Sequence, residues 1–288
     1  MCQIFAYSSS KRTKLNSILK EFYSHSEEHP NGWGLATFDG VHANIEREPL
    51  RAAKSNYLKE RFTEDIAAPV VLAHIRKATI GNVELKNCHP FTGFDTEGRR
   101  WTLIHNGTVF EFEPMNKYVK RQKGETDSER ILLYIIDKIN EESKNKNRSL
   151  SESERFKVIE NIVTKLSKGN KLNLIIYDGD LLYVHTNLEG SLNYYQGNKF
   201  VLFATEPLVK GSIYDGENDN GWSGMKESDW EKCPEEKILS HEDWNEVPVA
   251  TLLGYKGKDL IYKGSEHGNL YVEDPKDLEH IYLSYANL

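Results

Sequence analysis

The second residue of the chain, Cys2, carries the side chain with the clearest chemical potential. A small residue after the initiator Met1 allows that methionine to be removed, which leaves a thiol and a free α-amine on the same residue. A free α-amine has a pKa of roughly 7.7 to 8.0, so at neutral pH it can accept the thiol proton, directly or through a water. Such a nucleophile carries its own base. Cysteine also occurs at position two by chance, so a catalytic interpretation depends on the rest of the sequence.

Five short motifs follow Cys2 in order along the chain. They are His29-Pro30-Asn31-Gly32-Trp33-Gly34, Arg76-Lys77-Ala78-Thr79-Ile80-Gly81, Asn87-Cys88-His89-Pro90, His105-Asn106-Gly107 and Glu125-Thr126-Asp127-Ser128-Glu129. Their order and spacing closely resemble the glutaminase domain of class II glutamine amidotransferases, over roughly the first 130 residues. The segment Phe203–Leu208 extends this resemblance more loosely. The first motif and the N-terminal run Met1–Tyr7 are most similar to short stand-alone members, rather than to enzymes that fuse this domain to a synthase.

Two charged residues match the family's clamp for the amino-acid end of glutamine. The resemblance implies that Arg76 holds the α-carboxylate, a task that suits a planar, permanently charged guanidinium, with Thr79 adding a hydroxyl donor. Asp127 matches the carboxylate that receives the α-ammonium. Each also has a simpler interpretation: Arg76 as a surface arginine in an ion pair, and Asp127 as an acid that stabilises the first turn of a helix.

The dipeptide Asn106-Gly107 matches the family's oxyanion hole. By that resemblance the Asn106 amide and the Gly107 backbone N–H face the oxygen that becomes negative in a tetrahedral intermediate. Taken alone, Asn-Gly is a common hairpin turn, and only the accompanying motifs favour the catalytic interpretation.

The remaining matched residues have supporting roles. Trp33 and Gly34 match a segment beside the nucleophile and are expected among the substrate-binding residues, through packing and backbone contacts rather than proton transfer. His89 either contacts the substrate or orders its loop, and we favour the second role. Lys77 and Ile80 depart from the synthase-fused relatives, which have an aromatic residue and often a histidine at these positions. Both changes lie beside the clamp and concern the choice between free glutamine and a γ-glutamyl peptide or amine.

Composition narrows the class of partner. The net charge is -7 and the pI about 5.9, without the long basic stretch that nucleic acid or an anionic membrane would require. The N-terminus has no signal-peptide h-region, and no segment reaches membrane-spanning length. Three widely spaced cysteines fit neither a disulfide framework nor a zinc site, which favours a reducing cytoplasm.

Hydrophobic periodicity predicts strands, then two helices, then strands. We expect helices around residues 15–22, from the capping-box form at 126–129 through 139, and around 159–166, with Gly169 ending the last. We expect strands at 4–7, 34–38, 69–75, 101–104, 200–205 and 247–253, and a hairpin at 172–185. The remaining polar stretches predict an exposed loop at 140–154 and a loop or insertion at about 211–245. This pattern indicates a mixed α+β protein, which we interpret as one domain over residues 1–288. The resemblance implies more: the four-layer αββα fold of N-terminal-nucleophile hydrolases, with antiparallel sheets.

The expected activity is hydrolysis of the γ-amide of glutamine or of a γ-glutamyl compound through a Cys2 thioester, with no metal or cofactor. Two alternatives stay open. In the first, the chain is the glutaminase subunit of a two-chain amidotransferase and delivers ammonia to a separate synthetase. In the second, it is a non-catalytic binding or regulatory module, for instance because Met1 is retained.

Overall fold

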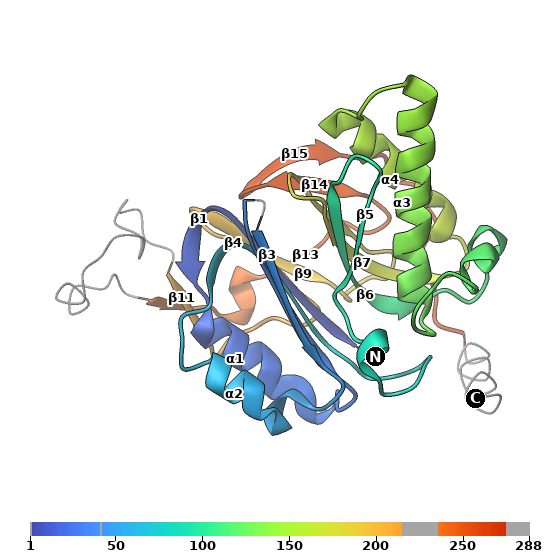
Figure 1. The fold of residues 1–288 in the computed structure, drawn as a ribbon. Coiled ribbons are helices and arrows are strands. Elements are labelled where there is room, and N and C mark those ends of the chain that lie inside the picture. Colours follow the sequence, from blue (N-terminus) through green and yellow to red (C-terminus); the bar gives the residue numbers. More distant parts are fainter. Residues whose placement is uncertain (1, 41, 215–235, 275–288) are drawn as a thin grey trace.

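The computed structural model describes residues 2–40, 42–214 and 236–274. Two antiparallel sheets lie face to face, and helices cover the outer face of each (Figure 1). In both sheets, some neighbouring strands come from segments that are far apart in the sequence. Met1, Cys233 and the centre of the expected insertion at 211–245 lie outside the described residues.

The first sheet holds the N-terminus. Its strand order is β13-β9-β10-β1-β4-β2-β3, so the first strand of the chain lies in the middle. Apolar side chains on its outer face pack under the helices α1 (Asn16–Ser24) and α2 (Asn56–Arg61). The strands are β1 (Gln3–Lys14), β2 (Trp33–Asp39), β3 (His42–Glu48), β4 (Ala67–Ile75), β9 (Asn193–Gln196), β10 (Phe200–Ala204) and β13 (Asn245–Glu246).

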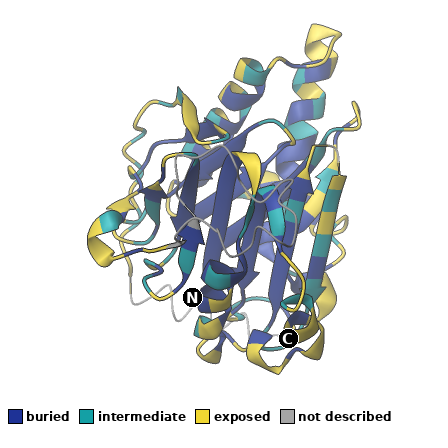
Figure 2. Ribbon diagram, turned by 90° about the vertical axis from the view of Figure 1, so that its left-hand side faces the viewer, coloured by how far each residue is buried: buried dark blue, intermediate teal, exposed yellow. Residues whose placement is uncertain are grey.

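The second sheet has the order β15-β14-β8-β7-β6-β5, and the long helices α3 (Asp127–Lys146) and α4 (Glu152–Leu166) pack on its outer face. Its central strands are buried along their whole length. Buried residues fill the middle of the molecule, and exposed residues lie mainly around its edge (Figure 2). The strands are β5 (Phe91–Phe94), β6 (Arg100–Thr108), β7 (Lys171–Tyr177), β8 (Leu182–His185), β14 (Leu253–Lys256) and β15 (Asp259–Lys263).

Alternation along the strands separates three apolar layers. In β1, Phe5 packs toward α1, whereas Ile4 and Ala6 pack between the sheets. In β6, Leu103 packs toward α3 and Ile104 faces the first sheet. Side chains that alternate in this way bury one face of each sheet against the other sheet and the opposite face against helices. This gives the four-layer αββα architecture, as the family resemblance implied.

The polar stretch at 140–154 is mostly helical, so the prediction of an exposed loop is wrong except at its centre. Helix α3 continues to Lys146 with help from an i,i+4 ion pair between Lys146 and Glu142, 3.5 Å apart. It ends at Asn147, which adopts a left-handed conformation (φ 52°). A capping box between Ser151 and Glu154 then starts α4.

Two other local predictions need correction. The stretch 247–253 is not a strand, because β13 ends before it, β14 begins only at Leu253, and Ala250 in between has a φ of 53°. At the start of α3, Thr126 caps the helix by accepting a hydrogen bond from the Glu129 N–H (3.3 Å). The Glu129 carboxylate binds the backbone N–H groups of residues 123 and 124, so the box is only half formed.

The flanks of the 211–245 stretch form a small two-stranded sheet of their own, β11 (Ser212–Tyr214) with β12 (Glu236–Ile238). Within the described ranges, no helix has the length and apolar character needed to cross a bilayer.

Candidate active site

Cys2 lies just before β1, at the end of the central strand of the first sheet. Gln3 pairs with Ile75 on β4, so Cys2 is next to the residues that follow Ile75. Its thiol donates to the carbonyl oxygen of Lys77, with Sγ 3.4 Å from that oxygen. Because Ile4 faces the space between the sheets, alternation directs Cys2 to the same side.

The charges of Arg76 and Asp127 both affect the pKa of the Cys2 thiol. Burial raises the pKa of Cys2; the Lys77 carbonyl contact and Arg76 lower it, and Asp127 raises it. The net rise keeps the thiol protonated at neutral pH, so nucleophilic attack requires a base. The structure thus brings Cys2, Arg76 and Asp127 together at one end of the sandwich, although they lie far apart in the sequence.

Arg76 follows β4 and is almost fully buried, with 3% of its surface exposed. This excludes the interpretation as a surface arginine. Its Nη1 donates to the carbonyl oxygen of Asn82 at 2.8 Å, and its Nη2 donates to those of Ile80 and Gly81 at 2.8 and 2.9 Å. Two backbone bonds hold its main chain: the Arg76 N–H donates to the Gly32 carbonyl at 2.8 Å, and the Asn31 N–H donates to the Arg76 carbonyl at 3.0 Å. The guanidinium is therefore fixed in position by the loop that follows it.

Asp127 is the first residue of α3 and is buried. Its Oδ2 accepts the backbone N–H of Val109 at 2.7 Å, and its Oδ1 accepts that of Ser128 at 2.9 Å. Thr126 caps the helix, so the Asp127 carboxylate is not the cap, although it lies in the first turn. It joins the start of α3 to the segment that leaves β6.

Asn106 and Gly107 lie inside β6, paired with Asn173 and Leu172 on β7. The alternative of an Asn-Gly hairpin turn is therefore wrong. Asn106 is 1% exposed, and its Oδ1 has no hydrogen-bond partner among the described residues. By alternation with Ile104, its side chain faces the space between the sheets, as Cys2 does.

Gly34 and Trp33 have separate roles. A Cβ built on Gly34 would overlap the carbonyl oxygen of His89, so glycine permits the close approach of two segments. The Trp33 ring lies on the opposite face of β2, edge-on to Tyr23 at 5.9 Å, and its Nε1 donates to Glu48 at 3.0 Å. The structure does not bring this ring to the thiol, which corrects the prediction of Trp33 as a substrate-binding side chain.

His89 is buried between His74, whose ring centroid is 4.0 Å away, and Phe91 at 4.7 Å. Burial lowers the pKa of His89 well below its usual value, with further lowering from His74, so the ring is neutral at pH 7. This placement fits the favoured role of ordering the loop. Thr79 lies partly exposed, two residues beyond the carbonyl that contacts the thiol.

Sequence reasoning gave no role to three polar residues that organise this end of the molecule. The Asn31 Oδ1 accepts the Ala78 N–H at 3.0 Å, and Asn87 and Glu125 join the two loops that flank the site. All three stand inside the quoted motifs. Position within a motif was the available signal, but their partners became visible only in the fold.

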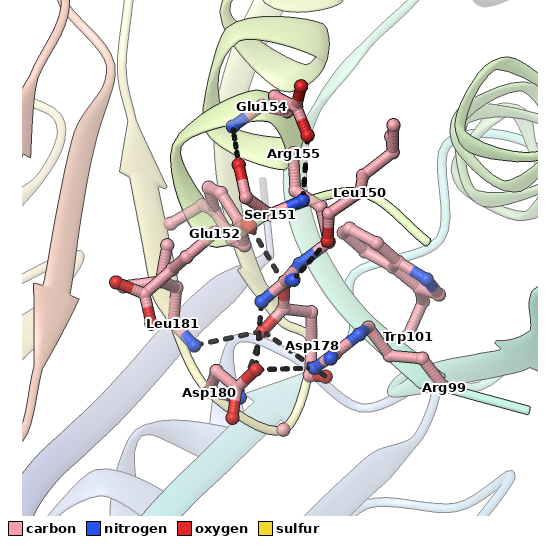
Figure 3. A network of polar contacts seen from close by, with 12 residues as sticks. Arg99, Trp101, Leu150, Ser151, Glu152, Glu154, Arg155, Asp178, Asp180 and Leu181 are labelled. Atoms are coloured by element: carbon pink, nitrogen blue, oxygen red, sulfur yellow. Dashed lines mark hydrogen bonds and ion pairs between the residues drawn. The ribbon is translucent and has the colours of Figure 1, made fainter. Parts of the chain in front are cut away.

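A hollow of about 580 Å³ lies at the other end of the sandwich, away from the thiol. Its wall contains a closed network in which Arg155 donates to Asp178 at 2.7 Å and to Asp180 at 2.8 Å, while Arg99 donates to Asp180 at 2.7 Å (Figure 3). These partners satisfy one another and join the β7–β8 turn to α4. We assign this network to stability.

In the part of the chain that the structure describes, no group of three histidine, cysteine or acidic side chains could hold a metal ion.

Comparison with known proteins agrees with this geometry. The model of the family described as class-II glutamine amidotransferases matches residues 1–197. The protein MJ1515 of Methanocaldococcus jannaschii is 26% identical over 270 residues, covering 91% of this chain and 71% of that protein. YafJ of Escherichia coli K12 is 30% identical over 162 residues, covering 56% of this chain and 62% of YafJ, less than two thirds of its length.

The glutamine phosphoribosylpyrophosphate amidotransferase from B. subtilis has a similar fold, with a TM-score of 0.59 at 13% identity over 93% of this chain and 49% of that one. This likeness confirms the N-terminal-nucleophile type of fold. On the evidence of the family model, the chain belongs to the class II glutamine amidotransferases.

Proposed function

We propose that the chain, once Met1 is removed, hydrolyses the γ-amide of glutamine or of a γ-glutamyl compound through a thioester on Cys2. The observation that carries this proposal is the position of the Cys2 thiol beside a buried cation and a buried anion: its Sγ contacts the carbonyl oxygen of Lys77, which follows Arg76, and the charges of Arg76 and Asp127 both affect its pKa. A free α-amino acid presents the complementary pair of charges. We treat residues 1–288 as one domain with this activity.

The reaction begins with transfer of the thiol proton to the α-amine of Cys2, directly or through a water. The sulfur attacks the γ-carbonyl carbon, and the oxyanion accepts hydrogen bonds from the Asn106 amide and the Gly107 N–H. As the C–N bond breaks, the leaving amine takes the proton from the Cys2 ammonium. Water, deprotonated by the same α-amine, then attacks the thioester, and the free acid leaves as the thiol is restored.

In this proposal Arg76 binds the α-carboxylate, Asp127 binds the α-ammonium, and the Thr79 hydroxyl adds a hydrogen bond. Both charged groups are buried and held by backbone contacts. A pre-oriented pair of this kind loses little conformational entropy when a ligand binds.

We further propose that a γ-glutamyl peptide or amine is a better substrate than glutamine. Lys77 is exposed next to the thiol, and Ile80 belongs to the loop around Arg76, so the positions that differ from the synthase-fused relatives lie at the site. A reducing compartment preserves a free thiol, and we therefore propose a cytoplasmic location. The alternative is a glutaminase subunit that passes ammonia to a separate synthetase chain.

The test begins with an intact mass of the purified protein, which establishes whether Met1 has been removed. A panel of γ-glutamyl amides and glutamine then compete for the enzyme, and the ammonia, peptide or amine released from each compound is measured. The proposal expects the highest kcat/KM for a γ-glutamyl peptide or amine. A preference for free glutamine that a separately encoded synthetase enhances would support the subunit alternative, and a processed protein that binds these ligands without turnover would support the non-catalytic module.

A further inference from the structure

One carboxylate joins the loop after Arg76 to the loop before Asp127. The Glu125 Oε2 accepts the Asn82 N–H at 3.0 Å and the Asn87 Nδ2 at 2.6 Å. The Glu125 backbone N–H donates in return to the Asn87 Oδ1 at 2.8 Å. Glu125 and Asn87 therefore hold each other through both main-chain and side-chain atoms.

The same network reaches both halves of the proposed amino-acid clamp. The carbonyl oxygen of Asn82 accepts Nη1 of Arg76 at 2.8 Å and Nδ2 of Asn87 at 3.0 Å. The loop that Glu125 binds is thus the loop that fixes the guanidinium. On its other side, Glu125 is followed by the helix cap and then by Asp127 at the start of α3.

The packing around this network leaves little space for movement. A Cβ on Gly81 would approach the Asn87 Nδ2 to 3.0 Å and the Glu125 Oε2 to 3.2 Å. A Cβ on Gly124 would overlap the Asn87 Oδ1. Hydrogen bonds, first from Lys86 and then from Asn87, lower the pKa of Glu125 to about 2. Its carboxylate is therefore ionised at neutral pH and can only accept hydrogen bonds.

We propose that Glu125, acting with Asn87, is a positioning residue that sets the distance between Arg76 and Asp127. This inference rests on the proposed function, because it concerns how the clamp recognises an α-amino acid. A ligand that carries both an α-carboxylate and an α-ammonium on one carbon requires a defined separation between its two partners. A ligand that uses only one of them tolerates a shift of the loop.

The experiment compares calorimetric binding of L-glutamate with that of glutarate, which lacks the α-ammonium. It uses the processed wild-type protein, Glu125→Ala and Glu125→Gln. Glu84→Gln is the matched control, since the Glu84 carboxylate contacts the same Lys86 at 3.1 Å and lies on the same loop, but is not bonded to the side chain of Asn87. Melting temperatures show whether each variant is folded, and Glu125→Gln carries the test if the alanine variant does not fold.

We expect Glu125→Ala to raise the Kd for L-glutamate about tenfold, with a smaller rise in Glu125→Gln, because small misplacements of binding groups are costly. The Kd for glutarate should change less than about twofold, and Glu84→Gln should bind both ligands as the wild type does. Unchanged L-glutamate binding in Glu125→Ala, or an equal loss for both ligands, would overturn the inference. A wild-type protein that binds no L-glutamate would instead overturn the proposed function, and this inference with it.

Discussion

Gly107 on β6 lies against the carbonyl oxygen of Lys171 on β7 so closely that a Cβ would overlap that oxygen and come within 2.6 Å of the His105 Nε2. We therefore predict that Gly107→Ala separates the two strands where the proposed oxyanion hole lies. Overpacking of this kind costs about 1–3 kcal/mol, and the shift of the N–H should reduce kcat by about a hundredfold. Urea unfolding and steady-state kinetics check both effects.

Gly190→Ala is the control, because Gly190 has a φ of 65° with open space around its Cβ position. That variant should lose about 1 kcal/mol of unfolding free energy and keep kcat. Equal kcat for Gly107→Ala and wild type would contradict the proposed role of the Gly107 backbone.

Asn106→Ala should lower kcat by about a hundredfold or more with little change in KM, because it removes a donor that acts on the oxyanion and not on the ground state. The Asn106 Oδ1 has no partner among the described residues, so its loss should leave the melting temperature almost unchanged. A variant that keeps its kcat would exclude Asn106 from the oxyanion hole.

Arg76→Lys should raise KM for γ-glutamyl substrates. A lysine ammonium cannot reproduce the contacts of the guanidinium with the carbonyl oxygens of residues 80–82, so the loop and the carboxylate site both change. Steady-state kinetics on glutamine, with circular dichroism to confirm folding, provide the measurement. Wild-type KM and kcat in this variant would remove Arg76 from the clamp.

Stability should fall as the pH drops below about 6.5. Burial lowers the pKa of both His74 and His185 to about 3. The unfolded chain binds protons at these groups below pH 6.5 and the folded chain does not, so each contributes a loss of up to about 1.4 kcal/mol per pH unit down to about pH 3. Unfolding free energies at pH 7.5 and 5.0 measure this loss above the range where carboxylates titrate.

Burial lowers the pKa of His185, and its hydrogen bonds fit the neutral ring. The carbonyl oxygen of Leu172 accepts from its Nδ1 at 3.2 Å, so its Nε2 must accept from the His267 Nε2 at 3.0 Å. The His267 Nδ1 in turn accepts the Asn269 N–H at 3.1 Å. His185→Phe should be less stable at pH 7.5 but lose less on acidification, and an identical pH dependence in variant and wild type would contradict this assignment.

The strands and helices with strong apolar periodicity were predictable, whereas elements stabilised by tertiary contacts were not. The hairpin at 172–185, the helix beginning near 126 and the helical stripe at 159–166 carry clear patterns or caps, whereas the start of α4 at Glu152 fell inside the expected loop. The edge strand β3 is polar along most of its length and is ordered by pairing with β2, and α2 is only six residues long. Neither gives a signal in a single sequence.

The same distinction applies to the site. Motif order indicates Cys2, Arg76 and Asp127 as site residues, since charge types and spacing are visible in the sequence. The face of the sheet on which the Trp33 side chain lies depends on strand register. The hydrogen bonds between Glu125 and Asn87 depend on two loops meeting in space. Residue type alone contains neither fact.

The most direct test of the account is glutamate release from a γ-glutamyl amide by the processed protein and by its Cys2→Ala variant, each with its N-terminus verified by intact mass. The thioester mechanism predicts turnover by the wild type and a loss of at least about a hundredfold in the variant, because the alanine keeps the α-amine but removes the nucleophile. Equal turnover by the two proteins would contradict the thioester mechanism.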